Sequence, residues 1–343
     1  MLDNIIKINL QLFAGNLNTN VTTDPGLSAE NKTFYDKALI QEASPNLIHD
    51  QFGQKRPIPK GSGKKVEFRK YASLPKATTP LTEGVTPDGK KLSVSIVEAE
   101  VAQYGDYVAL SDILDLTAID NNVLEATKAC GRQAGLTLDT ITRNVLQSGT
   151  NVFYCPKVGA DGTTTEVAER SEMDGTCKLT VDVVKRVVAF LRASNAPKIN
   201  GDYVAIIHPY VAYDLMSDPH WEEAHKYAKP ENIFEGEIGR IAGVRFVETS
   251  EAAIYTGTEN DCPTGLAVFG CLFLADGAYG VTEITGGGLQ TIVKQLGSAG
   301  SADPLDQRST VGWKATKTAE ILIEAYMIRV ECTSAFSGDA VMN

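Results

Sequence analysis

The spacing of apolar residues predicts two amphipathic helices. The shorter helix spans residues 180–194, with Thr180 as its N-cap and five aliphatic residues facing inward. The longer one spans Asp120 to Leu146, where apolar and small residues recur every three or four positions. That face consists of Val123, Thr127, Cys130, Ala134, Leu138, Ile141 and Val145. Both patterns indicate helices that cover a core.

Alternating apolar and polar residues predict a two-stranded ribbon between residues 64 and 110. A span rich in proline, glycine and threonine separates the two strands. After Ile96 the apolar positions shift by one residue, as a β-bulge would allow, so the two ends of this strand are expected to face different neighbours. An isolated two-stranded ribbon is marginal in water, so either the chain's own body or another subunit must cover it. The alternating apolar positions are Val66, Phe68, Leu92, Val94 and Ile96.

The C-terminal half of the chain has the composition of strands. The helices come first along the chain and the strand-rich region follows. This order predicts an α+β protein and not regular βαβ units. Pro209 disfavours a helical backbone at His208, so the strand at 203–207 ends there and a helix can start. Strand composition is found at 203–207, 244–249, 266–274, 289–295 and 319–333.

Composition narrows the functional classes. The 343 residues include 43 acidic and 32 basic side chains, a net charge of -11, which opposes passive adhesion to DNA or anionic membranes. Six scattered cysteines form no C-x-x-C pair, so neither a zinc site nor a disulfide framework is indicated, and we expect reduced thiols. No stretch resembles a signal peptide or a membrane span, and we expect an intracellular protein without a membrane partner.

No catalytic, cofactor or metal constellation is predicted. His220 and His225 flank two glutamates but are five residues apart, whereas a zinc-protease helix needs histidines four apart. His208 is a conceivable general base, yet no nucleophile motif accompanies it, and a hydrogen-bonded structural histidine is favoured. A basic cluster between Lys55 and Lys70 fits solvated or inter-subunit pairing, with nucleic-acid contact as the alternative.

Several sequence blocks resemble one protein family. The chain is similar to the major capsid proteins of tailed bacteriophages, specifically the N-four-like major capsid family, and the similarity extends over essentially the whole chain. The blocks that carry it are TPLTEGVTPDGKKLSVS (79–95), QYGDYVALSD (103–112), QAGLTLD (133–139), SDPHW (217–221), IFEGEIGRIAGVRFVET (233–249) and VGWKA (311–315). The segment INLQLFA (8–14) also resembles the start of many phage coat proteins.

This resemblance implies the Hong Kong ninety-seven phage capsid fold. Its parts map onto an N-terminal arm at 1–62, an extended β-hairpin loop at 63–110 and a peripheral domain at 111–200, with the 120–146 helix as its spine. An axial domain at 201–318 follows, and a strand at 319–343 returns to the peripheral domain. Within the axial domain, Trp221, Gly236, Gly239 and Gly243 are expected to serve packing and turning.

The function implied by the resemblance is structural. Copies are expected to assemble into hexamers and pentamers of an icosahedral shell around double-stranded DNA, inside the host bacterial cytoplasm. The apolar positions of the ribbon would contact a neighbouring subunit. The implied partners are further copies of the chain, a portal, a separate scaffolding protein and decoration proteins, with packaged DNA nearby and no cofactor. The alternatives are an encapsulin-like compartment shell and, from another class, a hydrolase that uses His208.

Overall fold

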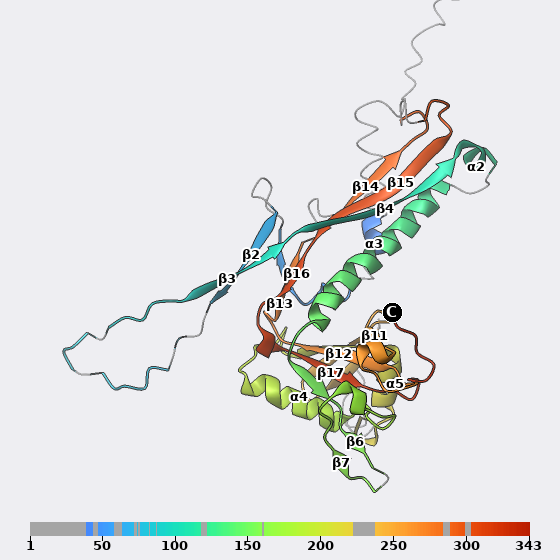
Figure 1. The fold of residues 1–343 in the computed structure, drawn as a ribbon. Coiled ribbons are helices and arrows are strands. Elements are labelled where there is room, and N and C mark those ends of the chain that lie inside the picture. The colour runs from blue at the N-terminus through green and yellow to red at the C-terminus, as the bar shows by residue number, and fades with distance from the viewer. Residues whose placement is uncertain are drawn as a thin grey trace, which may run out of the picture.

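The computed structural model describes residues 39–43, 47–57, 64–71, 74, 76–81, 83–86, 88–117, 122–159, 161–221, 237–283, 289–298 and 303–343. Within these ranges the chain forms an elongated unit, a compact unit and a projecting ribbon (Figure 1). None of the described helices is long and apolar enough to cross a bilayer.

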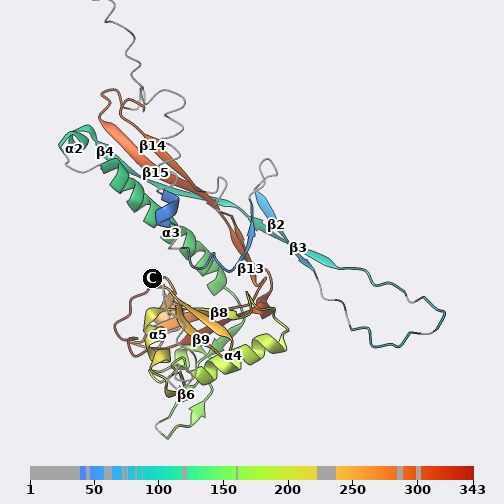
Figure 2. The same cartoon turned by 180° about the vertical axis from the view of Figure 1, so that it is seen from behind.

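The elongated unit consists of one long helix and a three-stranded antiparallel sheet. The helix is α3 (Asn122–Gln147), and it lies along the sheet in both views (Figures 1 and 2). Its apolar face packs against strand residues such as Val311, Trp313 and Ala315. A short helix, α2 (Asp112–Thr117), follows the edge strand. The strand order is β14 (Leu289–Lys294), β15 (Arg308–Lys317) and β4 (Ala102–Ser111).

A glycine on α3 lets the N-terminal segment approach the helix closely. Residues 39–43 are helical and pack across α3 with Leu39 and Ala43 buried. A Cβ atom on Gly131 would lie 2.9 Å from the carbonyl oxygen of Leu39, a distance that real side chains do not tolerate. Glycine in the middle of a helix costs about 1 kcal/mol relative to alanine, and here it permits this contact.

The compact unit is built on a mixed seven-stranded sheet. Helices α4 (Val181–Ala193) and α5 (Pro209–Met216) pack on it, and α4 buries Val184, Val187 and Leu191 in the main core. Thr180 caps α4, as its sequence predicts. The sheet path is β5 (Val152–Tyr154), β17 (Met327–Cys332), β12 (Val268–Leu274), β8 (Tyr203–Ile207), β10 (Val244–Glu248) and β9 (Glu237–Ile241), with β11 (Ala253–Tyr255) paired to β12.

Smaller elements join and decorate these units. A sheet of β1 (Gln54–Arg56), β13 (Tyr279–Thr282) and β16 (Ala319–Ile321) lies between them. The ribbon pairs β2 (Lys65–Tyr71) with β3 (Val94–Glu100). The rest are a hairpin of β6 (Lys157–Val158) and β7 (Thr164–Thr165), and the 3-10 turns η3 (Arg170–Glu172), η4 (Thr258–Asn260) and η6 (Glu324–Tyr326).

Some segments pack in a different unit from the one that the domain boundaries expected from the sequence assign to them. Strands β14 and β15 fall within the expected axial range, yet they pair with β4 and cover α3. Helix α4 falls within the expected peripheral range but packs with β8 and β12 in the compact unit. The C-terminal strand β17 joins that same compact sheet. Pairing between residues far apart in sequence decides these groupings, and local patterns do not report it.

Candidate assembly surfaces

The base of the ribbon is held inside the subunit. Val66, Phe68 and Ala99 are buried together, and Leu322 packs against them. The Phe68 ring occupies the space above Gly280, where a Cβ atom would lie 2.3 Å from Phe68 Cε1. Two of the five ribbon residues expected at an interface, Val66 and Phe68, therefore do not present free surface. Their side chains anchor the ribbon to the subunit's own body.

The other three predicted interface residues are on the opposite face. Leu92, Val94 and Ile96 are 61%, 45% and 53% exposed. Further out along the same excursion, Leu81 and Val85 are 77% and 62% exposed. Exposed apolar side chains in such a series mark a surface that contacts another molecule. Figures 1 and 2 show the ribbon extending away from both units, so this surface is free in the subunit.

The paired strands of the ribbon contain no β-bulge. Strands β2 and β3 pair in one continuous antiparallel register from Lys65 opposite Glu100 to Tyr71 opposite Val94. The shift of the apolar phase instead reflects a change of face. Near the body Val97 and Ala99 point inward, whereas Val94 and Ile96 are on the outer face.

The sheet of the elongated unit has a hollow on the face turned away from α3. Its volume is about 460 Å³, and its lining includes Tyr107 from β4, Ile292 from β14 and Gly312 from β15. These three residues are neighbours across the sheet by register. Tyr107 is 70% exposed and Ile292 is 42% exposed. Lys294 and Lys314 stand at the rim, so the hollow combines apolar contact area with positive charge.

A buried polar network fastens residues 47–57 to the base of α3. His49 bonds the Asp139 carboxylate through both its backbone N–H and its ring Nδ1, each at 2.7 Å. Asp50 accepts a hydrogen bond from Thr142 at 2.6 Å and forms an ion pair with Lys317. Lys317 is 1% exposed, and burial lowers its pKa, with the Asp50 carboxylate opposing that shift. The segment is therefore tied to the helix and the sheet by charges that water does not screen.

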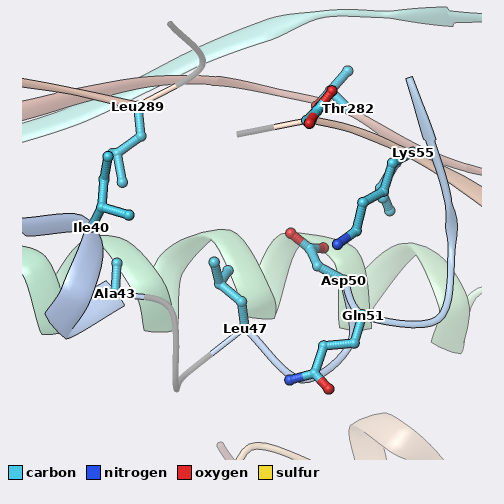
Figure 3. Close-up of a pocket in the computed structure, with 10 residues that line it drawn as sticks. Ile40, Ala43, Leu47, Asp50, Gln51, Lys55, Thr282 and Leu289 are labelled. Carbon is cyan, nitrogen blue, oxygen red and sulfur yellow. The ribbon is translucent and has the colours of Figure 1, made fainter. Parts of the chain in front are cut away.

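A cavity of about 330 Å³ lies beside this network (Figure 3). One end is apolar, where Ile40, Leu47 and Leu289 converge, and at the other end Lys55 and Asp50 point toward one another. The cavity marks where the N-terminal segment meets the sheet. Lys55, part of the basic cluster noted above, thus lies at the same end of the cavity as the Asp50 carboxylate.

The residues expected to pack and turn in the axial domain are in the compact unit. Trp221 is 5% exposed, and its ring meets Phe246 edge-on at 5.6 Å between centroids. Gly239 has φ 141° and Gly243 has φ 82°, and the latter forms the β9–β10 turn with Ala242. Gly236 lies outside the described residues. A packing role for Trp221 and a turning role for Gly243 are compatible with their geometry, whereas Gly239 lies within strand β9 opposite Phe246, next to a shift in the strand register.

His208 is a structural residue at the start of α5. Its backbone is extended, with φ -77° and ψ 147°, and its Nδ1 accepts a hydrogen bond from the Tyr210 N–H at 3.1 Å. The rings of Tyr210 and Phe269 pack against it. Burial lowers the pKa of His208 to about 4. The imidazole is thus neutral at pH 7 and serves as the N-cap of a helix.

Replacing His208 by asparagine should remove a pH dependence of stability. Because the pKa of His208 is lower in the folded state, the unfolded chain binds more protons between pH 6.5 and pH 4. Its contribution is therefore complete above about pH 7 and is lost as the pH falls through that window. Asparagine keeps an N-cap acceptor without titrating. Thermal unfolding from pH 4 to 7.5 should show a shallower decline for His208→Asn than for wild type, and parallel curves would contradict this assignment.

The strongest buried charge cluster was not expected from the sequence. Glu331 on β17 is fully buried, and Arg170 binds both of its carboxylate oxygens at 2.6 Å. Arg329 also contacts Glu331 at 3.0 Å, and Arg170 stacks on the Tyr255 ring at 3.9 Å. Arg170 is 161 positions from Glu331, so no local spacing reveals this pair. The cluster ties η3 to the sheet.

The other chemical candidates do not form a site in the described part of the chain. His220 is described, but His225 lies outside the described residues. Among the described side chains no cluster of three histidine, cysteine or carboxylate groups has metal-binding geometry. All six cysteines are buried free thiols.

Comparison with known families decides what this arrangement is. A phage capsid protein family model matches residues 95–323, which include nearly all of the second ribbon strand, α3, the compact unit except β17, and the long sheet strands β4 and β15. The chain belongs to the phage capsid protein family. It is a structural component of the virion shell and not an enzyme. The compartment-shell and hydrolase alternatives are not favoured.

Solved structures share this fold at low sequence identity. The capsid of cyanophage P-SCSP1u aligns with TM-score 0.59 and 14% identity, over 82% of this chain and 86% of that one. The cyanophage Pam1 capsid subunit gives 0.58 and 15%, over 86% and 93%. The capsid of Ralstonia phage GP4 gives 0.56 and 14%, over 83% and 86%. No curated protein sequence matches. The Hong Kong ninety-seven type of fold is therefore confirmed.

Proposed function

We propose that this capsid protein assembles into hexamers and pentamers that close an icosahedral shell around double-stranded DNA. The observation that carries the proposal is the ribbon, whose outer face exposes Leu81, Val85, Leu92, Val94 and Ile96 while its base is anchored in the subunit. A ribbon that exposes apolar side chains away from its own body gains stability by covering a neighbour.

The receiving surface on the neighbour is proposed to be the hollow on the β4–β15–β14 sheet. Its apolar walls, Tyr107 and Ile292, match the apolar side chains of the ribbon. The two lysines at its rim suit Glu83, which stands between Leu81 and Val85 in the ribbon. Contacts of this kind join unlike surfaces of two copies, and unlike contacts close into rings.

The domain assignment follows from the shared cores. We propose that residues 1–62 form the arm, 63–101 the extended loop, and α3 with β4, β14 and β15 the peripheral domain. The axial domain would then comprise the seven-stranded sheet with α4 and α5. This differs from the sequence-based boundaries where long-range strand pairing overrides chain order.

The remaining partners follow from the function. Each copy has a net charge of -11, so a shell built from these copies would hold DNA without strong adhesion to its wall. Assembly is proposed to occur in the host bacterial cytoplasm with a portal and a separate scaffolding protein, and decoration proteins would bind the outer surface. The alternative role of the basic cluster at 55–70, contact with nucleic acid, is less favoured because Lys65 pairs with Glu98 at 2.6 Å.

The ribbon can be tested directly by Leu81→Asp and Ile96→Asp. Both side chains are more than half exposed, so the subunit should fold with an unchanged thermal midpoint. Placing a carboxylate in an apolar interface carries a desolvation cost, and capsomers and shells should be lost. Sedimentation velocity and electron microscopy measure this outcome.

Val158→Asp is the matched control. Val158 is 38% exposed on the β6–β7 hairpin, away from the ribbon, and its substitution should leave assembly intact. Wild-type protein that stays monomeric under all conditions would contradict the proposed function. Ribbon variants that assemble as wild type does would contradict the role of the ribbon alone.

A further inference from the structure

Three cations gather on the outer side of α4 without a carboxylate partner among the described residues. Lys185 and Arg192 are two turns apart on the same side of the helix, and Lys198 follows in the next loop. The Arg192 Nη2 and Lys198 Nζ atoms each lie 3.5 Å from the position of a Cβ atom built on Gly243. Arg192 also donates to the Ala242 carbonyl at 3.4 Å. Two positive groups that converge on one turn repel unless an anion joins them.

Two of these cations, Lys185 and Arg192, line a hollow of about 690 Å³, which we name the α4 hollow. Its lining consists of Lys185, Val188, Ala189, Arg192, Ala193 and Ala242. The walls between the charges are thus small and apolar. This surface combines a positive rim with an apolar floor, which fits an apolar projection flanked by carboxylates.

Such a projection exists on the opposite side of the compact unit. Val341 and Met342 are 79% and 57% exposed. The Met342 Sδ atom accepts a hydrogen bond from Asn260 Nδ2 of η4 at 3.7 Å. Glu259, Asp261 and Asp339 are exposed around them, and no described lysine or arginine pairs with these carboxylates. We name this set of five residues (259, 261, 339, 341 and 342) the tail patch.

The projection is held firmly at its end. The Asn343 side chain donates to the carbonyls of Ser250 and Ala252 and accepts from the Ile254 N–H, while its carbonyl accepts from Arg143. Four hydrogen bonds at 2.9 to 3.2 Å fix the position of the neighbouring Val341 and Met342. A preorganised projection loses little entropy when it binds.

We propose that the tail patch of one copy seats in the α4 hollow of the next copy. Figures 1 and 2 place α4 and the C-terminus on opposite sides of the compact unit, so one subunit cannot satisfy both surfaces itself. Opposite faces of opposite charge give a head-to-tail contact, and repetition of that contact closes a ring of compact units. This inference rests on the proposed function, because it assigns the axial contact within the capsomer.

The decisive experiment uses two charge-reversed proteins. Lys185→Glu with Arg192→Glu makes the α4 hollow negative, and Glu259→Lys with Asp339→Lys makes the tail patch positive. All four side chains are exposed, so each protein should keep the thermal midpoint of wild type. Each protein alone presents like charges across the contact and should form no capsomer rings. Lys157→Glu reverses a partly exposed charge on the β6–β7 hairpin, whose surface pair with Asp174 at 3.7 Å contributes little to stability. This variant is the control and should assemble as wild type does.

Mixing the two proteins gives a sharper outcome. In the mixture every hollow can meet an oppositely charged patch only if the two proteins alternate around the ring. Alternation is possible in a ring of six but not in a ring of five. Electron microscopy of an equimolar mixture should therefore show hexameric rings without closed shells, whereas one chain carrying all four changes should restore both.

Raising the salt concentration should weaken these rings, since the contact depends on charges at a solvent-exposed rim. Charge-reversed proteins that form rings alone, as the Lys157→Glu control does, would overturn this contact while leaving the proposed shell function intact. A wild-type protein that forms no rings would instead overturn the shell function on which the contact rests.

Discussion

Asp50→Ala should destabilise the subunit by about 3–5 kcal/mol, because it leaves the Lys317 ammonium buried without its partner. The Thr142 hydroxyl would lose the same acceptor but retain the Leu138 carbonyl at 3.3 Å. The denaturant midpoint of the unassembled subunit measures the loss. The segment at 47–57 should also become accessible to protease, since Asp50 holds it against α3.

A double variant separates the cost of an orphaned charge from the value of the ion pair. Asp50→Leu combined with Lys317→Met replaces the buried pair by apolar groups and should recover most of the lost stability. Lys65→Ala is the control, because its partner Glu98 is half exposed and the pair lies at the surface, so no measurable change is expected. A single Asp50→Ala variant as stable as wild type would refute the anchoring role of this network.

Phe68→Ala should cost about 3–5 kcal/mol, the range for deleting a fully buried aromatic ring. The ring fills the space above Gly280 and holds the base of the ribbon to the subunit. Its removal should release β2 and β3, which limited proteolysis would show as new cleavage within 64–100. The thermal midpoint of the subunit should fall as well.

Ile96→Asp is the matched comparison within the same ribbon. Ile96 is on the opposite face and 53% exposed, so its substitution should impair assembly and leave the thermal midpoint unchanged. Phe68→Ala, in contrast, should lower the thermal midpoint of the isolated subunit. Equal effects of the two substitutions on stability would show that the ribbon has no inner and outer face.

The helices and the ribbon were predictable because their evidence is local. The helical period over 120–146 corresponds to α3 at Asn122–Gln147, and Thr180 caps α4 as expected. The alternation of Val66 and Phe68 with charged residues correctly assigned a strand with one apolar face. It did not reveal whether that face covers the subunit itself or a neighbour, because both uses require the same alternation.

The candidate surfaces were less predictable, since each joins residues from distant parts of the chain. The α4 hollow combines one helix face with a turn about fifty residues later, brought together by the sheet. The Arg170–Glu331 cluster joins residues 161 positions apart. The strand expected at 319–333 is interrupted by η6, which separates β16 in the central sheet from β17 in the compact sheet.

The sequence by itself determined the α+β class, the main helices, the ribbon and the resemblance to capsid proteins, because periodicity and sequence blocks are properties of contiguous residues. Only the tertiary structure decided that Val66 and Phe68 anchor the ribbon, that β14 and β15 cover α3, and that opposite charges occupy opposite sides of the compact unit. These outcomes depend on which distant strands pair and which faces they bury, and burial is settled by packing of the whole chain.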